Sequence, residues 1–217
     1  MMAPRTPDRP GTPRKPGTPN KHELRTAETR ERLLKAAEQV FLRDGYERAE
    51  LGEIAKLAGR TKGAIYAQFE SKEAIFLALV EMHALRRRGK VQKHLNASAS
   101  TRENLATFRK DFLASVNDET WGLLLLEFKL YSLRHPDAQD RLKRVYETII
   151  PSNEEAVYAS LLGSPGRGKA ALGRAPAVHA GFAMLTGLTV EARFGGKLDA
   201  QTMEKIAARL FEALFDR

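Results

Sequence analysis

Residues 50–73 read ELGEIAKLAGRTKGAIYAQFESKE, and this stretch contains two short amphipathic helical patterns, a tight turn between them and the start of a further helix. Leu51, Ile54 and Ala58 recur at helical spacing, which predicts one buried face on the first of these helices. Gly59 follows, and glycine tolerates the left-handed conformation that closes a helix, so the turn is expected there. The layout is that of a DNA-reading helix-turn-helix, although a helical hairpin in any all-α domain has the same spacing.

The second short helix has an inward and an outward face. Thr61 can cap it through its hydroxyl, and Ile65 and Phe69, four residues apart, are expected to point inward. The outward residues are short, cationic or hydrogen-bonding: Lys62, Ala64, Tyr66, Ala67 and Gln68. Such a face fits the major groove, where a helix needs small side chains to approach closely and a few donors to reach base edges and phosphates.

From about Thr29 to Val80 the chain resembles the N-terminal domain of the TetR family of bacterial regulators. The resemblance rests on the first helix RERLLKAAEQVFLRDGY, on the helix-turn-helix, and on the block Lys62, Gly63, Ala64, Ile65 and Tyr66 followed by Phe69, Ser71, Lys72 and Glu73. It implies an all-α homodimer. Small N-terminal domains would bind a pseudo-palindromic operator, and larger C-terminal domains would dimerise and usually enclose an effector pocket.

The resemblance also implies which side chains meet DNA. Tyr66 would reach a phosphate or a base, and Lys72 at the start of the fourth helix would hold a phosphate with help from the positive end of that helix. Gly63 would allow close approach, the methyl group of Ala64 suits a thymine methyl, and Gln68 would pair with adenine or reach only a phosphate or water. The predicted DNA contacts are Arg60, Thr61, Lys62, Gly63, Ala64, Tyr66, Gln68 and Lys72.

The charge of the chain agrees with a nucleic-acid partner. Lys and Arg number 36 against 27 Asp and Glu, which gives a formal charge of +9. Residues 1–100 contain 20 basic and 12 acidic residues, whereas the remaining 117 contain 16 and 15. The excess lies with the proposed DNA-binding part, as attraction to phosphates requires.

Three parts are expected along the chain: a disordered, basic, Pro-rich arm over 1–22, a TetR-like helix-turn-helix domain over 23–70, and a helical effector-binding and dimerisation domain over 71–217. The arm contains the near-repeat RPGTP and KPGTP. It would follow phosphates or enter the minor groove, or it would be a solvated extension with no role. Thr26 is expected to cap the first helix, which closes at Gly45.

The fourth helix links the two domains and, by resemblance, acts as the lever through which an effector moves the DNA-binding end. Its cationic run at 86–90 is interpreted as a solvated face. Further helices are predicted at 101–116, 119–135, 137–162, 177–194 and 200–215.

Aromatic and flexible apolar residues of this C-terminal part are candidates for a ligand pocket, because such groups suit small organic ligands. They are Phe112, Trp121, Phe128, Tyr131, Tyr146, Tyr158 and Met184. Simple core packing explains the same helical spacing.

The last two helices have apolar stripes that would pair with their symmetry mates in a four-helix interface. The predicted interface residues are Leu185, Leu188, Ala192, Met203, Ile206, Ala207, Leu210 and Leu214.

Catalysis, metal binding and cofactor binding are not expected. Residues 163–170 match a phosphate-binding loop except that Ala170 replaces its final Ser or Thr, the ligand of magnesium. The chain has no cysteine, its five histidines form no zinc-binding pattern, and no nucleophile and base stand together.

The sequence thus predicts a cytoplasmic, dimeric, TetR-like transcriptional regulator without membrane association. It would bind double-stranded operator DNA as a repressor and respond to a small-molecule ligand. The alternatives are an architectural basic DNA-binding protein without an effector, and a nucleotide-using enzyme built on the loop at 163–170.

Overall fold

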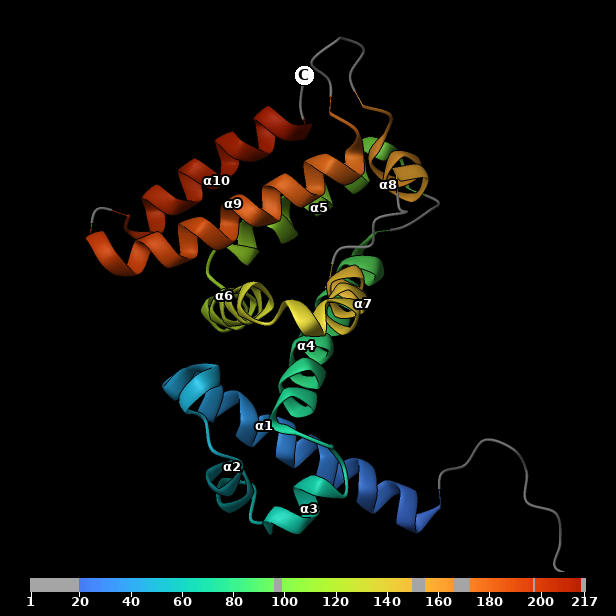
Figure 1. Ribbon diagram of the computed structural model, residues 1–217. Helices are drawn as coiled ribbons and strands as arrows, with labels where there is room; N and C mark the ends of the chain where they lie inside the picture. Colours follow the sequence, from blue (N-terminus) through green and yellow to red (C-terminus); the bar gives the residue numbers. More distant parts are fainter. Residues whose placement is uncertain (1–19, 96–98, 150–154, 166–171, 197, 216–217) are drawn as a thin grey trace, which may run out of the picture.

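A computed structural model describes residues 20–95, 99–149, 155–165, 172–196 and 198–215 (Figure 1). The helices in these ranges are α1 (Lys21–Arg48), α2 (Leu51–Leu57), α3 (Lys62–Tyr66), α4 (Lys72–His94), α5 (Thr101–Ser115), α6 (Glu119–Arg134), the 3₁₀ helix η1 (Pro136–Ala138), α7 (Gln139–Ile149), α8 (Glu155–Leu162), α9 (Arg174–Gly195) and α10 (Ala200–Phe215). The described ranges contain no β-strand, and the predicted all-α fold is confirmed.

The first helix begins five residues before the predicted cap at Thr26. Asn20 and Glu23 form a capping box: the Glu23 backbone N–H donates to Asn20 Oδ1 at 2.9 Å, and the Asn20 N–H donates to Glu23 Oε2 at 2.9 Å. Because each side chain satisfies a backbone donor of the other, the helix starts at Lys21. Of the predicted arm, residues 1–19 lie outside the described residues.

Gly45 interrupts α1 near its end, close to where the sequence predicts closure. Its φ of 72° and ψ of 172° are not helical, and one further turn follows before Ala49. This break directs the Tyr46 N–H toward α6, where it donates to Glu127 Oε2 at 3.1 Å. The end of the first helix is therefore tied to a helix more than 70 residues away.

A first hydrophobic core joins α1 through α4 to α6 and α7. Phe41, Tyr46 and Phe76 form a group of rings that extends to Tyr131 of α6, with Tyr46 and Tyr131 only 4.4 Å apart between centroids. Figure 1 shows α4 rising from the small N-terminal helices into the larger helical body. The predicted domain boundary at residue 70 stays a prediction.

A second core fills the far end of the body, between α5, α8, α9 and α10. Phe108 and Phe112 of α5 pack against Phe211 and Phe215 of α10, with ring centroids 5.4 to 6.4 Å apart. The N-terminus of α9 is held in the same region, where Glu155 of α8 accepts two backbone N–H groups from α9 at 2.8 and 2.7 Å.

The prediction of a single helix over 137–162 is wrong. The structure has α7 ending at Ile149 and α8 beginning at Glu155, and residues 150–154 between them lie outside the described residues. The sequence places Pro151 there, and proline inside a helix lacks the N–H and clashes with the preceding turn. The helix predicted from 177 begins earlier, at Arg174. Within the described ranges, none of the helices has the length and apolar character needed to cross a membrane.

Candidate nucleic-acid interface and ligand cavity

The turn between α2 and α3 forms at the predicted glycine. Gly59 has a φ of 64°, its N–H donates to Lys56 O at 3.1 Å, and the Arg60 N–H donates to Ala55 O at 2.9 Å. These two bonds are those of a Schellman ending, in which a left-handed glycine allows the last carbonyls of a helix to be satisfied. The backbone then leads directly into Thr61.

The cap and the buried face of α3 also form as predicted. Thr61 Oγ1 accepts the Ala64 N–H at 3.3 Å, and Ile65 and Phe69 are buried. Arg30 of α1 lies with its guanidinium 4.4 Å from the Phe69 ring centroid and donates to Gln68 O at 3.5 Å. This cation–π interaction holds the segment that follows α3 against the first helix. Sequence reasoning missed Arg30, because nothing near residue 30 indicates a partner almost 40 residues away.

The outward face of α3 is open to solvent. Lys62 and Gly63 are exposed, Ala64 and Gln68 are half-buried, and the side chain of Tyr66 is 59% exposed. The ring of Tyr66 is therefore accessible from solvent. Arg60 is half-buried, and its guanidinium donates to Gly59 O at 3.2 Å beside the turn.

The start of α4 holds Lys72 more firmly than the sequence suggested. Ser71 Oγ accepts the Ala74 N–H at 3.0 Å and so caps the helix. The Lys72 ammonium donates to Glu47 O at 2.9 Å and lies 4.7 Å from the ring centroid of Tyr46. One of its three N–H groups is thus used within the protein, and two remain for an anion.

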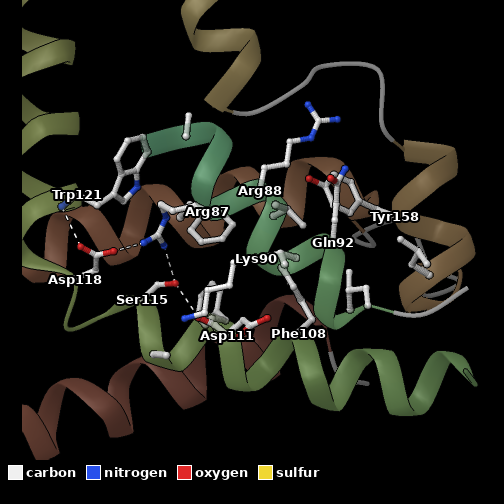
Figure 2. A pocket seen from close by; sticks show the side chains of 18 of the residues that line it. Arg87, Arg88, Lys90, Gln92, Phe108, Asp111, Ser115, Asp118, Trp121 and Tyr158 are labelled. Atoms are coloured by element: carbon white, nitrogen blue, oxygen red, sulfur yellow. Dashed lines mark hydrogen bonds and ion pairs between the residues drawn. The ribbon is translucent and has the colours of Figure 1, made fainter. Parts of the chain in front are cut away.

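A cavity of about 180 Å³ lies in the body between α4, α5, α6, α8 and α9 (Figure 2). Its walls are mainly apolar, with Phe108 and Phe112 from α5, Trp121 from α6, Tyr158 from α8 and Phe182 from α9. Polar side chains from α4 and α5 line the rest, among them Arg87, Arg88, Lys90, Gln92, Asp111 and Ser115.

Arg87 has several partners at the edge of this cavity. Its guanidinium forms an ion pair with Asp118, donates to Ser115 Oγ at 2.8 Å, and lies 5.6 Å from the Trp121 ring centroid. Asp118 also accepts the Trp121 N–H at 3.1 Å and caps α6. Burial lowers the pKa of Arg87 below the ordinary arginine value, and Asp118 opposes that shift. The interpretation of the run at 86–90 as a solvated face is therefore wrong for Arg87, because the helix turns that residue into the body.

The N-terminal part of the chain is similar to known proteins. The family model described as bacterial regulatory proteins, tetR family, matches residues 33–79, which hold most of α1, all of α2 and α3, and the first turns of α4. Over 54 residues the chain is 56% identical to the HTH-type transcriptional repressor BepR of Brucella suis, an alignment that covers 25% of this chain and 26% of that protein. Residues 33–79 therefore match the DNA-binding domain of the TetR family.

Other relatives extend the comparison along the chain. It is 31% identical over 99 residues to the HTH-type transcriptional activator FasR of Mycolicibacterium smegmatis, covering 46% of this chain and 45% of that one. The chain thus spans between a quarter and about half of the length of these curated relatives. The structure of NalD, the secondary repressor of the MexAB-OprM multidrug efflux pump in Pseudomonas aeruginosa, has a TM-score of 0.61 at 23% identity and covers 88% of this chain and 96% of that chain, which shows a shared fold.

The predicted pocket residues fall into three places. Phe112, Trp121 and Tyr158 line the cavity. Phe128 and Tyr131 are instead buried in the first core, because their side of α6 packs on α1 and α4. Tyr146 on α7 and Met184 on α9 are not at the cavity and are 38% and 42% exposed. Contact of any of these residues with a ligand stays a prediction.

The predicted dimer residues are partly used within the protomer. Leu185, Met203 and Ala207 are buried in the second core, because α9 and α10 pack on each other and α10 on α5. They have almost no surface to offer a second copy of the chain. The others are less enclosed: Leu188, Ala192 and Leu214 pack partly against that core, and Ile206 and Leu210 are half-buried. The outer side of α9 exposes Met184 and Phe194, the latter by 80%.

Proposed function

We propose that this chain is a transcriptional regulator that binds a pseudo-palindromic operator in double-stranded DNA as a homodimer, represses transcription there, and is released by a small-molecule effector. The observation that carries the proposal is the open face of α3, on which Lys62 and Tyr66 are exposed at the end of a helix-turn-helix. We place the protein in the cytoplasm, together with the DNA it would bind.

The roles of individual residues follow from this face. Lys62 and Tyr66 would contact phosphates or base edges, and the small Gly63 and Ala64 would let the helix approach the major groove. Further DNA contacts at the edge of this face would come from Arg60, Thr61, Gln68 and Lys72. Arg30 would act as a positioning residue, because it holds the end of α3 without facing the groove.

Repression is favoured by the names of relatives. BepR is described as a repressor, and the fold-sharing NalD as a secondary repressor of an efflux pump, whereas FasR is described as an activator. A repressor that dissociates on binding an effector needs no contact with the transcription machinery, and is the simpler proposal for this chain.

The homodimer and its effector complete the mechanism. Met184 and Phe194 give α9 an exposed apolar side that a second copy could cover. A dimer would present two recognition helices roughly 34 to 36 Å apart, one turn of duplex, or a multiple of that distance. To change operator occupancy from 99:1 to 1:99, an effector must prefer the released state by about 10⁴-fold, roughly 5.5 kcal/mol, shared between two cavities.

The first test is a fluorescence-polarisation titration of the purified protein against DNA that flanks its own gene, at fixed moderate salt with excess nonspecific competitor. We expect saturable binding to one palindromic site by two copies of the chain. Affinity that is indifferent to sequence would instead indicate an architectural DNA-binding protein, because phosphate contacts alone carry no sequence information.

The second test removes the exposed ring. Tyr66→Ala is expected to weaken operator binding by roughly fivefold to a hundredfold or more, which corresponds to about 1 to 3 kcal/mol for one good contact, while the protein folds and assembles as before. Tyr146→Ala is the matched control, since it truncates another exposed tyrosine far from α3. Unchanged operator affinity of Tyr66→Ala would remove the assigned role of that residue.

The nucleotide-enzyme alternative has no support among the relatives, which are regulators. Residues 166–170 of the glycine-rich loop on which it depended lie outside the described residues.

A further inference from the structure

The cavity has an apolar body and one charged edge. Phe108, Phe112, Trp121, Tyr158 and Phe182 supply rings from four helices, and the charged side chains gather where α4 meets α5 and the start of α6. Figure 2 shows Arg87, Ser115 and Asp118 on one side, connected by hydrogen bonds and an ion pair. Such an arrangement orients a ligand with an apolar body and a single polar group.

The charged edge favours an anion. Its lining has three basic residues, Arg87, Arg88 and Lys90, against two acidic ones, Asp111 and Asp118. Both carboxylates are engaged, Asp111 with His94 Nδ1 at 2.8 Å and Asp118 with Arg87. An amine would have to compete with these bonds, whereas an anion would meet a net positive lining.

Arg87 is the group that an anion would reach. It is mostly buried, with 23% of its side chain exposed, and burial lowers its pKa despite the nearby Asp118. Guanidinium groups have five N–H donors in a planar fork that matches a carboxylate, and Ser115 and Asp118 leave part of that fork for a second acceptor. Asp118 is 38% exposed, so its oxygen can be solvated if the pair opens.

The volume limits the size of the ligand. An apolar cavity of about 150 Å³ accepts benzene, and the cavity here is only a little larger, at about 180 Å³. One ring with a short chain, or a short alkyl chain, fits this space.

We propose that the cavity binds a small organic acid, whose carboxylate pairs with Arg87 in exchange for Asp118 and whose apolar body lies among the aromatic side chains. This inference names the chemical class of the effector and rests on the proposed function. It also assigns Arg87 as the residue that determines ligand specificity.

The exchange acts on the helix that reaches the DNA-binding end. Arg87 belongs to α4, whose first residues include Lys72, and Asp118 caps α6, which is bonded to the end of α1 through Glu127. Opening the Arg87–Asp118 pair removes a tie between α4 and α6. A carboxylate therefore changes how these two helices are held, whereas a neutral ligand of the same shape leaves the pair closed.

The experiment uses Trp121, the single tryptophan of the chain and part of the cavity wall. Its fluorescence is titrated in the full-length protein with three matched probes, namely 3-phenylpropanoate, 3-phenylpropanamide and 3-phenylpropylamine, and with octanoate and octanamide. We expect each carboxylate to bind roughly tenfold to a hundredfold more tightly than its amide, as for one hydrogen bond to a charged group. Tighter binding of the amides or the amine, or no binding of any probe, would overturn the ligand class.

Two substitutions shift this preference in opposite directions. Arg87→Met is expected to bring carboxylate affinity down to that of the amide. Asp118→Asn removes the competing charge but keeps a side chain that can cap α6, so carboxylates should bind several-fold more tightly with amide affinity unchanged. Arg86→Met is the control, because Arg86 is an exposed neighbour on α4 that does not line the cavity.

A purely structural Arg87–Asp118 pair predicts a different result. Both substitutions would then lower stability and leave the ratio of carboxylate to amide affinity at its wild-type value, which would overturn the assignment. Operator binding is measured separately by polarisation without probe. If the wild-type protein shows no sequence-specific DNA binding, the proposed function is refuted. The ligand class is decided by the fluorescence titration alone.

Discussion

Gly45 offers a quantitative test of how the first helix is joined to the body. Its φ of 72° and ψ of 172° lie in a region that is essentially restricted to glycine, and holding another residue there costs about 1 to 3 kcal/mol. A Cβ added at Gly45 would also lie 3.1 Å from Glu127 Oε1, the carboxylate that accepts the Tyr46 N–H. Gly45→Ala therefore strains the backbone and crowds the bond between α1 and α6.

The expected loss can be read as a melting temperature. For a chain of this size each 1 kcal/mol shifts the midpoint by about 2 to 4 °C, so Gly45→Ala should lower it by roughly 2 to 12 °C. The assay is thermal unfolding followed by circular dichroism at fixed protein concentration, since association makes the midpoint concentration-dependent.

Gly89→Ala is the matched control, because it makes the same chemical change inside α4 where a Cβ meets open space. Alanine is the better helix former there by roughly 0.5 to 1 kcal/mol, so this variant should melt slightly higher than the wild type. If Gly45→Ala melts at or above the wild-type temperature while Gly89→Ala behaves as expected, the assigned strain at Gly45 is refuted.

Three further outcomes are expected. Thr61→Ala should lower operator affinity and destabilise the protein by about 1 kcal/mol through loss of the α3 cap, and Thr61→Ser should restore both in polarisation and unfolding measurements. Hydrogen bonds from Ser100 hold the pKa of Glu103 below its ordinary value, so the Glu103 carboxylate stabilises the fold fully above the ordinary pKa. This stabilisation is lost as the pH falls through the lowered pKa. The difference in stability between wild type and Glu103→Gln should therefore shrink between the ordinary and the lowered pKa and stay constant near neutral pH. In Gly181→Ala, a Cβ 2.7 Å from the Phe112 ring should destabilise the protein by about 1 to 3 kcal/mol and alter the affinity for cavity probes, whereas wild-type behaviour in both assays would contradict the tight packing.

The helix-turn-helix could be predicted in detail because its signals are local. The left-handed conformation of Gly59 depends only on the helix end beside it, and Thr61 accepts the backbone N–H of a residue three positions away. The capping box of Asn20 and Glu23 is equally local, but it directly follows a proline-rich stretch, and the predicted start was placed too late at Thr26.

The cavity could not be predicted in the same way. Phe112 and Phe128 have the same chemistry and the same helical spacing, yet one lines the cavity and the other is in the core between α6 and the N-terminal helices. Arg87 stands among three other basic residues in the sequence, and only the direction in which α4 packs turns it toward Asp118 and Trp121.

The sequence by itself determined the helix-turn-helix, its turn at Gly59, the cap at Thr61 and the resemblance of the N-terminal part to the TetR family, because each depends on residues a few positions apart. Only the tertiary structure decided which apolar stripes of α9 and α10 are buried within the protomer, that Arg30 holds α3, and that Arg87 meets Asp118 at a cavity. Those outcomes depend on how helices distant in the chain pack together, and helical periodicity defines a face without defining what that face contacts.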